Sequence, residues 1–138
     1  MKKEWETEPN VVKFEYNGLK CFILRHSSFL HLCGYVGLPP SHFFYEKKNI
    51  EQLPLNIHGG ITFSEFGDGS QDNLFEKGYH WIGFDCNHSF DFVPGAQFFD
   101  NQTNLSYKNI DFAIREVKSL AKQLDPINIT IKKLIQSD

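Results

Sequence analysis

The feature that most constrains the fold is the Asn17-Gly18 pair, which separates two apolar-rich runs at residues 11–16 and 19–25. Asparagine and glycine tolerate positive φ better than other residues, and the commonest two-residue hairpin turn needs positive φ at both positions. The second run carries apolar side chains on both of its faces, which is typical of a strand that is covered on both sides. The pattern therefore predicts an N-terminal β-hairpin whose second strand is central or covered.

Two further segments complete a framework of sheet and helix. Residues 79–85 have the alternation of a core strand. Between residues 107 and 124 the apolar side chains recur at helical spacing, and Asp125-Pro126 ends this pattern. Aromatic residues make up 15% of the chain and favour a sheet-rich fold. We predict an α+β fold in which a mostly antiparallel sheet, containing the N-terminal hairpin, packs against a C-terminal amphipathic helix.

The segments between these elements carry weaker patterns. Residues 55–57 and 61–63 are β-like runs around Gly59-Gly60, which is consistent with a tight hairpin or with one bent strand. Residues 64–78 are polar and punctuated by glycines, as in a surface loop. Residues 86–107 lack periodicity, and their aromatic content indicates an ordered loop.

The length of 138 residues suits one globular domain with a sizeable core. We predict a single domain over residues 1–138, with 1–10 and 133–138 as candidate mobile ends. Residues 127–131 alternate like a final strand or an extended tail.

Charge and cysteine content limit the partners that we expect. The net charge is -3 and no long basic run occurs, so general binding to nucleic-acid backbones is not expected. The chain has neither an N-terminal signal-peptide pattern nor an apolar run that could span a membrane, so no membrane partner is expected. The three cysteines do not form close pairs, which is typical of reduced thiols in a cytoplasmic protein.

Side chains that could carry chemistry concentrate in residues 81–91 and 57–63. The first segment passes from an apolar strand into acid, thiol, amide, imidazole and acid, and the second places a histidine before a glycine pair. Imidazoles and carboxylates can transfer protons near neutral pH. The candidate catalytic residues are His58, Asp85 and His88. Their joint action requires the loop after Asp85 to lie over the turn at residues 58–60, at one edge of the sheet.

The same side chains could instead bind a metal. Imidazole and carboxylate groups are ligands for zinc or iron, but the spacing here matches no standard zinc pattern. A divalent metal is therefore the minority hypothesis, and we leave the cofactor open, including the case of none. If a metal is bound, the ligands would be His58, Asp85, His88 and Asp91. A weaker alternative makes Cys86 a nucleophile that one of the two histidines activates.

Six residues are candidate ligand-binding positions. The bare backbone of a glycine pair can approach an anion closely, although a plain turn between strands explains the same pair. Aromatic rings can stack on a planar ligand, although most such rings fill cores. The candidate ligand-binding residues are Tyr35, His42, Gly59, Gly60, Trp81 and Asp91.

Three sequence blocks, at residues 34–42, 58–63 and 81–88, occur in an order that resembles a family of small phage and bacterial proteins. The resemblance spans roughly residues 20–124. Because the family has no established activity, the resemblance implies a phage or prophage setting and a shared site, without implying a reaction. The residues that it singles out are Tyr35, His42, His58, Asp85, His88 and Asp91.

These observations leave three classes of function open, and whether the protein is an enzyme is left open with them. The first hypothesis is a phage or prophage accessory protein that captures a small polar or nucleotide-like ligand, or a host protein. The alternative is a hydrolase, either metal-dependent or acid–base, that uses His58, Asp85 and His88. The third is a purely structural or interaction protein.

Overall fold

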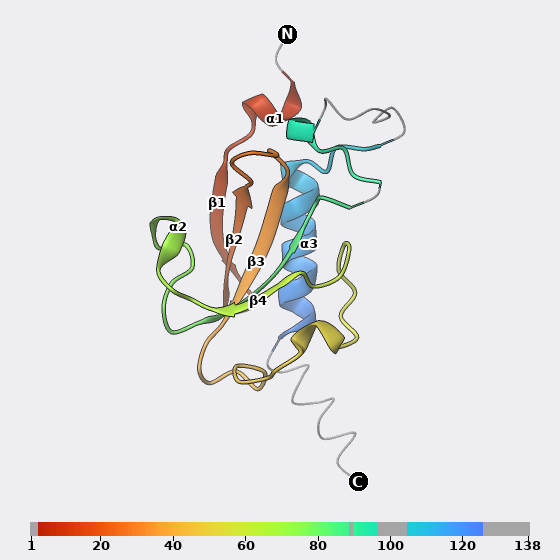
Figure 1. The fold of residues 1–138 in the computed structure, drawn as a ribbon. Coiled ribbons are helices and arrows are strands. Elements are labelled where there is room, and N and C mark those ends of the chain that lie inside the picture. The colour runs from red at the N-terminus through yellow and green to blue at the C-terminus, as the bar shows by residue number, and fades with distance from the viewer. Residues whose placement is uncertain (1–2, 89, 97–104, 126–138) are drawn as a thin grey trace.

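A computed structural model describes residues 3–88, 90–96 and 105–125. These residues form a five-stranded sheet in the order β1-β2-β3-β5-β4, in which every pair of neighbouring strands is antiparallel, and helix α3 lies against one face (Figure 1). The elements are α1 Glu4–Thr7, β1 Val11–Tyr16, β2 Leu19–Arg25, β3 Leu32–Leu38, η1 Ile50–Gln52, β4 Phe63–Phe66, α2 Ser70–Asn73, β5 His80–Asp85, η2 Pro94–Ala96 and α3 Ile110–Gln123. The predicted α+β class is confirmed.

The predicted N-terminal hairpin is present. Asn17 and Gly18 both have positive φ, at 52° and 75°, and they join β1 to β2 in the predicted register, with Tyr16 opposite Leu19. Strand β1 forms one edge of the sheet, and β2 is mostly buried because α3 covers one of its faces and an aromatic cluster covers the other.

Two apolar clusters hold the sheet in place. The larger one lies between the sheet and α3, where Val117 and Leu120 are fully buried against Val36 and Ile82. The smaller one lies on the opposite face, beneath the segment that contains α2, and it is aromatic. Its buried members are Phe22, Cys33, Tyr35, Leu74, Phe75 and Trp81. In β5, Ile82 and Phe84 therefore lie in the larger cluster and Trp81 lies in the smaller one, as expected for the alternating faces of a central strand.

Helix α3 begins three residues later than the first residue of the predicted pattern. The side chain of Asn109 accepts a hydrogen bond from the Phe112 N–H, and this N-cap fixes the first turn. At the other end, the Leu124 N–H bonds back to the Leu120 carbonyl.

The segment before β4 differs from the prediction. Residues 55–57 are not a strand, because the backbone N–H and C=O of Asn56 bond to the side chain of Gln123 on α3, at 2.7 and 2.8 Å. Residues 58–60 form a turn and do not close a hairpin, and β4 begins only at Phe63. Residues 64–66, predicted as surface loop, belong to this edge strand.

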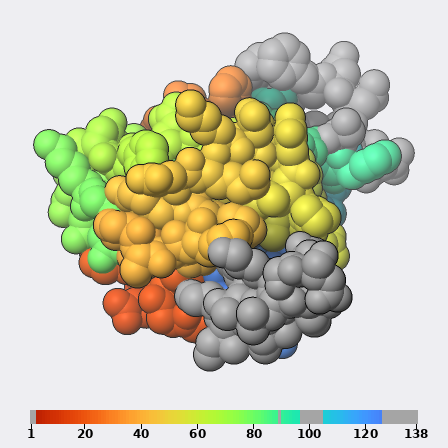
Figure 2. Space-filling view, turned by 90° about the horizontal axis from the view of Figure 1, so that it is seen from below, coloured from red at the N-terminus to blue at the C-terminus, as the bar shows by residue number. Residues whose placement is uncertain are grey.

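The connection from β3 to β4, residues 39–62, carries η1 and covers the lower end of the molecule, where Figure 2 shows it in orange to yellow. Within residues 3–88, 90–96 and 105–125, no helix has the length and apolar character needed to cross a membrane. The predicted strand at 127–131 and the end at 133–138 lie outside the described residues.

Candidate functional site

The loop that follows β5 lies directly over the turn at residues 57–60. The turn is closed by a hydrogen bond from the Gly60 N–H to the Ile57 carbonyl. Gly59 has a φ of 70°, and a Cβ atom at this position would stand only 2.0 Å from Nε2 of His88. The observed position of the His88 ring therefore depends on a glycine here, because any larger residue would push the ring away. The loop-over-turn geometry on which the predicted site depends is present.

His58 and Asp91 form the inner pair of this site. His58 Nε2 lies 2.8 Å from Asp91 Oδ2, and Asp91 is only 2% exposed. A carboxylate accepts hydrogen bonds, so Nε2 of His58 carries the hydrogen and donates it. The rings of Phe112 and His58 make a T-shaped contact, and the His58 backbone N–H donates to Glu116 at 2.9 Å, so helix α3 fixes the position of the turn.

Asp91 also binds the loop that carries it. The backbone N–H of His88 donates to Asp91 Oδ2 at 3.1 Å, and Lys108 Nζ lies 3.1 Å from Oδ1. Burial alone would raise the pKa of Asp91, but the hydrogen bonds from His58 and His88 and the contact with Lys108 outweigh burial and hold this pKa below its usual value. Asp91 is therefore a buried carboxylate that stays charged.

His88 and Asp85 form an outer pair. Their closest atoms, His88 Nε2 and Asp85 Oδ1, are 3.1 Å apart, and both side chains are 31% exposed. The His88 ring meets the His58 ring edge-on, with 5.5 Å between centroids. We call His58, Asp85, His88 and Asp91 the histidine–carboxylate cluster. It lies beyond the C-terminal end of β5, which is flanked by β3 and β4.

Three buried side-chain atoms in the described part of the chain have no hydrogen-bond partner: His31 Nδ1, His88 Nε2 and Asp91 Oδ1. The last two belong to the cluster, and His31 interacts electrostatically with it. The neighbours of the last two, Asp85 and Lys108, are close enough for charge attraction but do not meet hydrogen-bond geometry. His31 is 4% exposed and stacks on His26. Burial, followed by the charge of His26, lowers the pKa of His31, and the fields of Asp85, Asp91 and His88 also reach it.

The structure does not bring Tyr35, His42 and Trp81 to the cluster. Tyr35 and Trp81 belong to the aromatic cluster on the other face of the sheet, where their rings pack on Phe22. Burial raises the pKa of Tyr35 above its usual value. His42 accepts from the Phe44 N–H through Nδ1 and contacts the Leu124 carbonyl through Nε2, so it closes the end of α3. These three side chains have structural partners, because apolar burial and helix capping already use their surfaces.

Cys86 does not have the environment of a nucleophile. It is 2% exposed and packs in the core beneath α3. Burial, with a further contribution from Asp91, raises the pKa of the Cys86 thiol, which keeps it protonated. Within the described ranges, no three His, Cys, Asp or Glu side chains are grouped so that they could hold a metal ion. The geometry of the cluster is that of two separate histidine–carboxylate pairs.

Sequence reasoning missed His31, Lys108, Phe112 and Glu116. His31 lies before β3, and the other three lie on or just before α3, more than 45 residues from His58 in the sequence. The charged face of α3 was visible in the sequence as a pattern, but no sequence signal gives the register of that face against the turn at 57–60.

No protein-family model, curated protein or solved structure matches the chain. The resemblance to small phage and bacterial proteins therefore stays a prediction, and so does the phage setting that it implies. The host-protein partner and the cytoplasmic location, which was inferred from the cysteine content, also stay predictions. The function has to be argued from the site itself.

Proposed function

We propose that the histidine–carboxylate cluster binds a small polar ligand. The observation that carries this proposal is that two buried atoms of the cluster, His88 Nε2 and Asp91 Oδ1, lack a hydrogen-bond partner. Nδ1 of His31, which interacts electrostatically with the cluster, also lacks one. Buried polar atoms in native proteins almost always have a partner, and each one without it costs about 1–3 kcal/mol. A ligand with donors and acceptors would supply these partners, and the partial exposure of His58 and His88, 21% and 31%, gives solvent access.

The charge of the surroundings indicates the class of ligand. Asp85, Asp91 and Glu116 supply three carboxylates, and Lys108 supplies one cation near them. Three carboxylates against one ammonium group attract cations and repel phosphates. We infer an uncharged or cationic ligand, such as a nucleoside, in preference to a nucleotide.

The test uses matched nucleosides that differ only at the 5′ position, which carries a hydroxyl, an amine or a phosphate. Binding is followed by the NMR signals of the imidazole nitrogens of His58 and His88 and by the melting temperature. We expect the hydroxyl and amine compounds to shift both sets of signals, and the phosphate to bind at least about fivefold more weakly because of the nearby carboxylates. The signals of His42, which closes the far end of α3, are the internal control and should not move.

The competing explanation is a buried water that satisfies the same three atoms. Long-lived water contacts at His31 and His88 in NMR experiments, together with no response to any nucleoside, would contradict the proposal. A stronger response to the phosphate than to the amine would contradict the inferred ligand class.

A second function, acid–base hydrolysis at the same cluster, is favoured by one contact. Asp91 fixes the tautomer of His58 by accepting from Nε2, and this leaves Nδ1 of His58 as a proton acceptor. Such a site would convert a bound ligand, so products would accumulate with time in the same NMR samples. Conversion should fall by about 100-fold or more in His58→Ala, as expected for loss of a general base. Binding without conversion would contradict the hydrolysis function and support only the binding function.

A further inference from the structure

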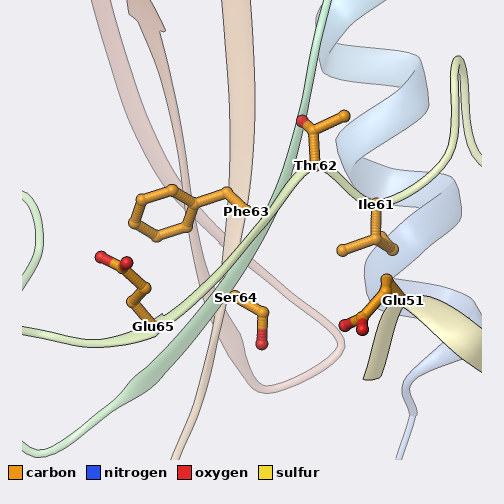
Figure 3. Close-up of a pocket in the computed structure, with 6 residues that line it drawn as sticks. All are labelled: Glu51, Ile61, Thr62, Phe63, Ser64 and Glu65. Atoms are coloured by element: carbon orange, nitrogen blue, oxygen red, sulfur yellow. The ribbon is translucent and has the colours of Figure 1, made fainter. Parts of the chain in front are cut away.

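A pocket of about 310 Å³ lies at the edge of the sheet formed by β4. The side chain of Ser64 projects from the opposite side of the strand from Phe63 and Glu65 (Figure 3). The residues that line the pocket are Glu51, Ile61, Thr62, Phe63, Ser64 and Glu65. None of these residues belongs to the histidine–carboxylate cluster.

Ser64 is hydrogen-bonded to a buried histidine whose tautomer can be assigned. Its Oγ lies 2.7 Å from Nε2 of His80, and Nδ1 of His80 lies 2.8 Å from the carbonyl oxygen of Tyr45. A carbonyl oxygen can only accept, so Nδ1 carries the hydrogen of the neutral ring. Nε2 therefore presents a lone pair, and the Ser64 hydroxyl donates to it. This is the arrangement in which a histidine can take the proton of a nucleophilic serine.

The surroundings of His80 hold this geometry in place. His80 is only 3% exposed, and the ring of Phe66 packs against it with 5.0 Å between centroids. The Tyr45 carbonyl occupies the place of the carboxylate in a serine–histidine–acid triad, because it orients the ring and fixes the tautomer.

The backbone of β4 supplies a donor beside the hydroxyl. The Gly67 N–H bonds to the Tyr79 carbonyl, and Glu65 lies opposite Trp81, so alternate amides of β4 point toward β5. By this alternation the N–H of Ser64 points away from β5, and β4 is the last strand of the described sheet. This amide is in position to donate to an oxyanion that forms at the Ser64 side chain.

We propose that Ser64 is the nucleophile and His80 the general base of an esterase site in this pocket. The Ser64 Oγ bonds to the carbonyl carbon of an ester, and its proton moves to His80 Nε2. The bond from that carbon to the alcohol oxygen breaks, and the alcohol leaves with the proton from His80. Water then adds to the acyl-serine and gives a proton to His80, which returns it to Ser64 Oγ as the carboxylic acid leaves.

The lining of the pocket selects the charge of the substrate. Glu51 contributes a carboxylate, the Glu65 side chain projects from the opposite side of the strand from Ser64 (Figure 3), and the lining contains neither lysine nor arginine. An anionic ester would therefore be repelled, and a cationic ester would be attracted. The volume of about 310 Å³ limits the substrate to a small ester.

The first test is covalent labelling of the intact protein with an uncharged alkyl fluorophosphonate. Ser64 should displace fluoride, and peptide mass spectrometry should locate the alkylphosphonyl group on Ser64. Ser64→Ala should abolish the label, whereas Ser41→Ala, at an exposed serine of the β3–β4 connection, should not change its rate. His80→Gln should slow labelling by about 100-fold or more, as expected when a general base is lost.

Because His80 is buried, the substitution could also disturb the fold, so a second readout uses the unaltered protein. Its labelling rate at Ser64 should fall at low pH in parallel with protonation of His80, followed by the NMR signals of that imidazole. Labelling spread over several serines, absence of label on Ser64, or a labelling rate that ignores the His80 titration would each overturn the proposal.

The second test compares acetylcholine with its uncharged isostere, 3,3-dimethylbutyl acetate, by release of acetic acid. The cationic ester should be hydrolysed about fivefold faster, and Glu51→Gln should remove this preference. Equal rates for the two esters in the unaltered protein would overturn the assignment of the substrate class. Both tests report on Ser64 and the walls of its pocket, so their outcome is independent of nucleoside binding at the histidine–carboxylate cluster.

Discussion

Two of the buried polar regions in the described part of the chain differ in how completely their hydrogen bonds are satisfied. The first is the arginine network, which we define as Glu8, Arg25 and Tyr107. Arg25 makes donor contacts with Asn10, Leu30, Tyr107, Glu8 and Pro9. The second is the histidine–carboxylate cluster, where buried atoms lack hydrogen-bond partners.

This difference distinguishes polar groups that stabilise the fold from polar groups that can bind a ligand. In the arginine network the Tyr107 hydroxyl donates to Glu8, and the other oxygen of Glu8 accepts from the Ile110 N–H, so the network joins the N-terminal segment to β2 and α3. Burial, followed by the bond to Glu8, raises the pKa of Tyr107, so this hydroxyl stays protonated. A network with every group satisfied rigidifies a fold, whereas a partly satisfied one has capacity left for a ligand.

The largest expected effect is the loss of the arginine network. Arg25→Met should lower the free energy of unfolding by about 3–5 kcal/mol, because the carboxylate of Glu8 would stay buried without its charge partner. Arg25 and Glu8 side chains are only 5% and 8% exposed. The measurement is urea unfolding, with the midpoint lowered and the slope unchanged.

Lys20→Met is the matched control for this prediction. Its partner Glu76 lies 2.7 Å away, but both side chains are 32% exposed. Solvent screening limits such a pair to about 0–1 kcal/mol. If the two methionine variants lost the same stability, the contrast between a satisfied buried network and a surface pair would be wrong.

The second prediction uses the neighbouring glycines at the turn. Gly59→Ala and Gly60→Ala should each cost about 1–2 kcal/mol, because both glycines have positive φ. The two variants should differ in ligand binding. A methyl group at Gly60 has no atom within 4 Å, whereas one at Gly59 would displace the His88 ring.

Because His88 is partly exposed, its ring can swing outward at little cost in stability. Gly59→Ala should therefore lose nucleoside binding and move the His88 imidazole signals, while Gly60→Ala keeps both. Urea unfolding measures the stability of the two variants, and NMR titration measures nucleoside binding and the His88 signals. Equal binding by both variants would show that the position of His88 does not matter to the ligand.

The fold was predictable where local chemistry decides it. Asn17-Gly18 fixed a hairpin because few other residue pairs adopt two positive φ values in succession, and the spacing of residues 107–124 fixed a helix because one apolar face had to be buried. Residues 55–57 were wrongly predicted as a β-like run. Their backbone partner is the side chain of Gln123, a contact 67 residues away that no local pattern contains.

Only the residue types of the site could be predicted from the sequence, and their arrangement could not. His58, Asp85, His88 and Asp91 were identified because their types suit chemistry, and the structure brings them together. Tyr35 and Trp81 were placed in the site by the same reasoning, but both rings pack on Phe22 in the aromatic cluster and do not reach the histidine–carboxylate cluster. Ser64 was missed because a serine in a polar run carries no signal until β4 pairs with β5 and brings it to His80.

We expect the smallest effect on stability from His31→Phe. This substitution also tests most directly whether the histidine–carboxylate cluster differs from the arginine network. Phenylalanine keeps an aromatic ring against His26 and removes the buried nitrogen that lacks a partner, so stability at neutral pH should stay within about 0.5 kcal/mol or rise. Nucleoside binding should weaken, because one of the three atoms that the ligand would satisfy is gone. Calorimetric titration and urea unfolding measure the two effects separately.

The same substitution should make stability less sensitive to acid. The pKa of His31 in the folded protein lies below its ordinary value of 6.5, so the unfolded chain binds this proton more readily. The stabilisation is complete above pH 6.5 and is lost as the pH falls from there toward the folded-state pKa. His31→Phe removes this loss and should lower the pH slope by at most about 1.4 kcal/mol per pH unit, one proton's worth. The lowered pKa of His42 leaves a residual slope, because that histidine is retained. A variant that lost stability at neutral pH would show that His31 already has a partner within the fold, and the cluster would then be as fully satisfied as the arginine network.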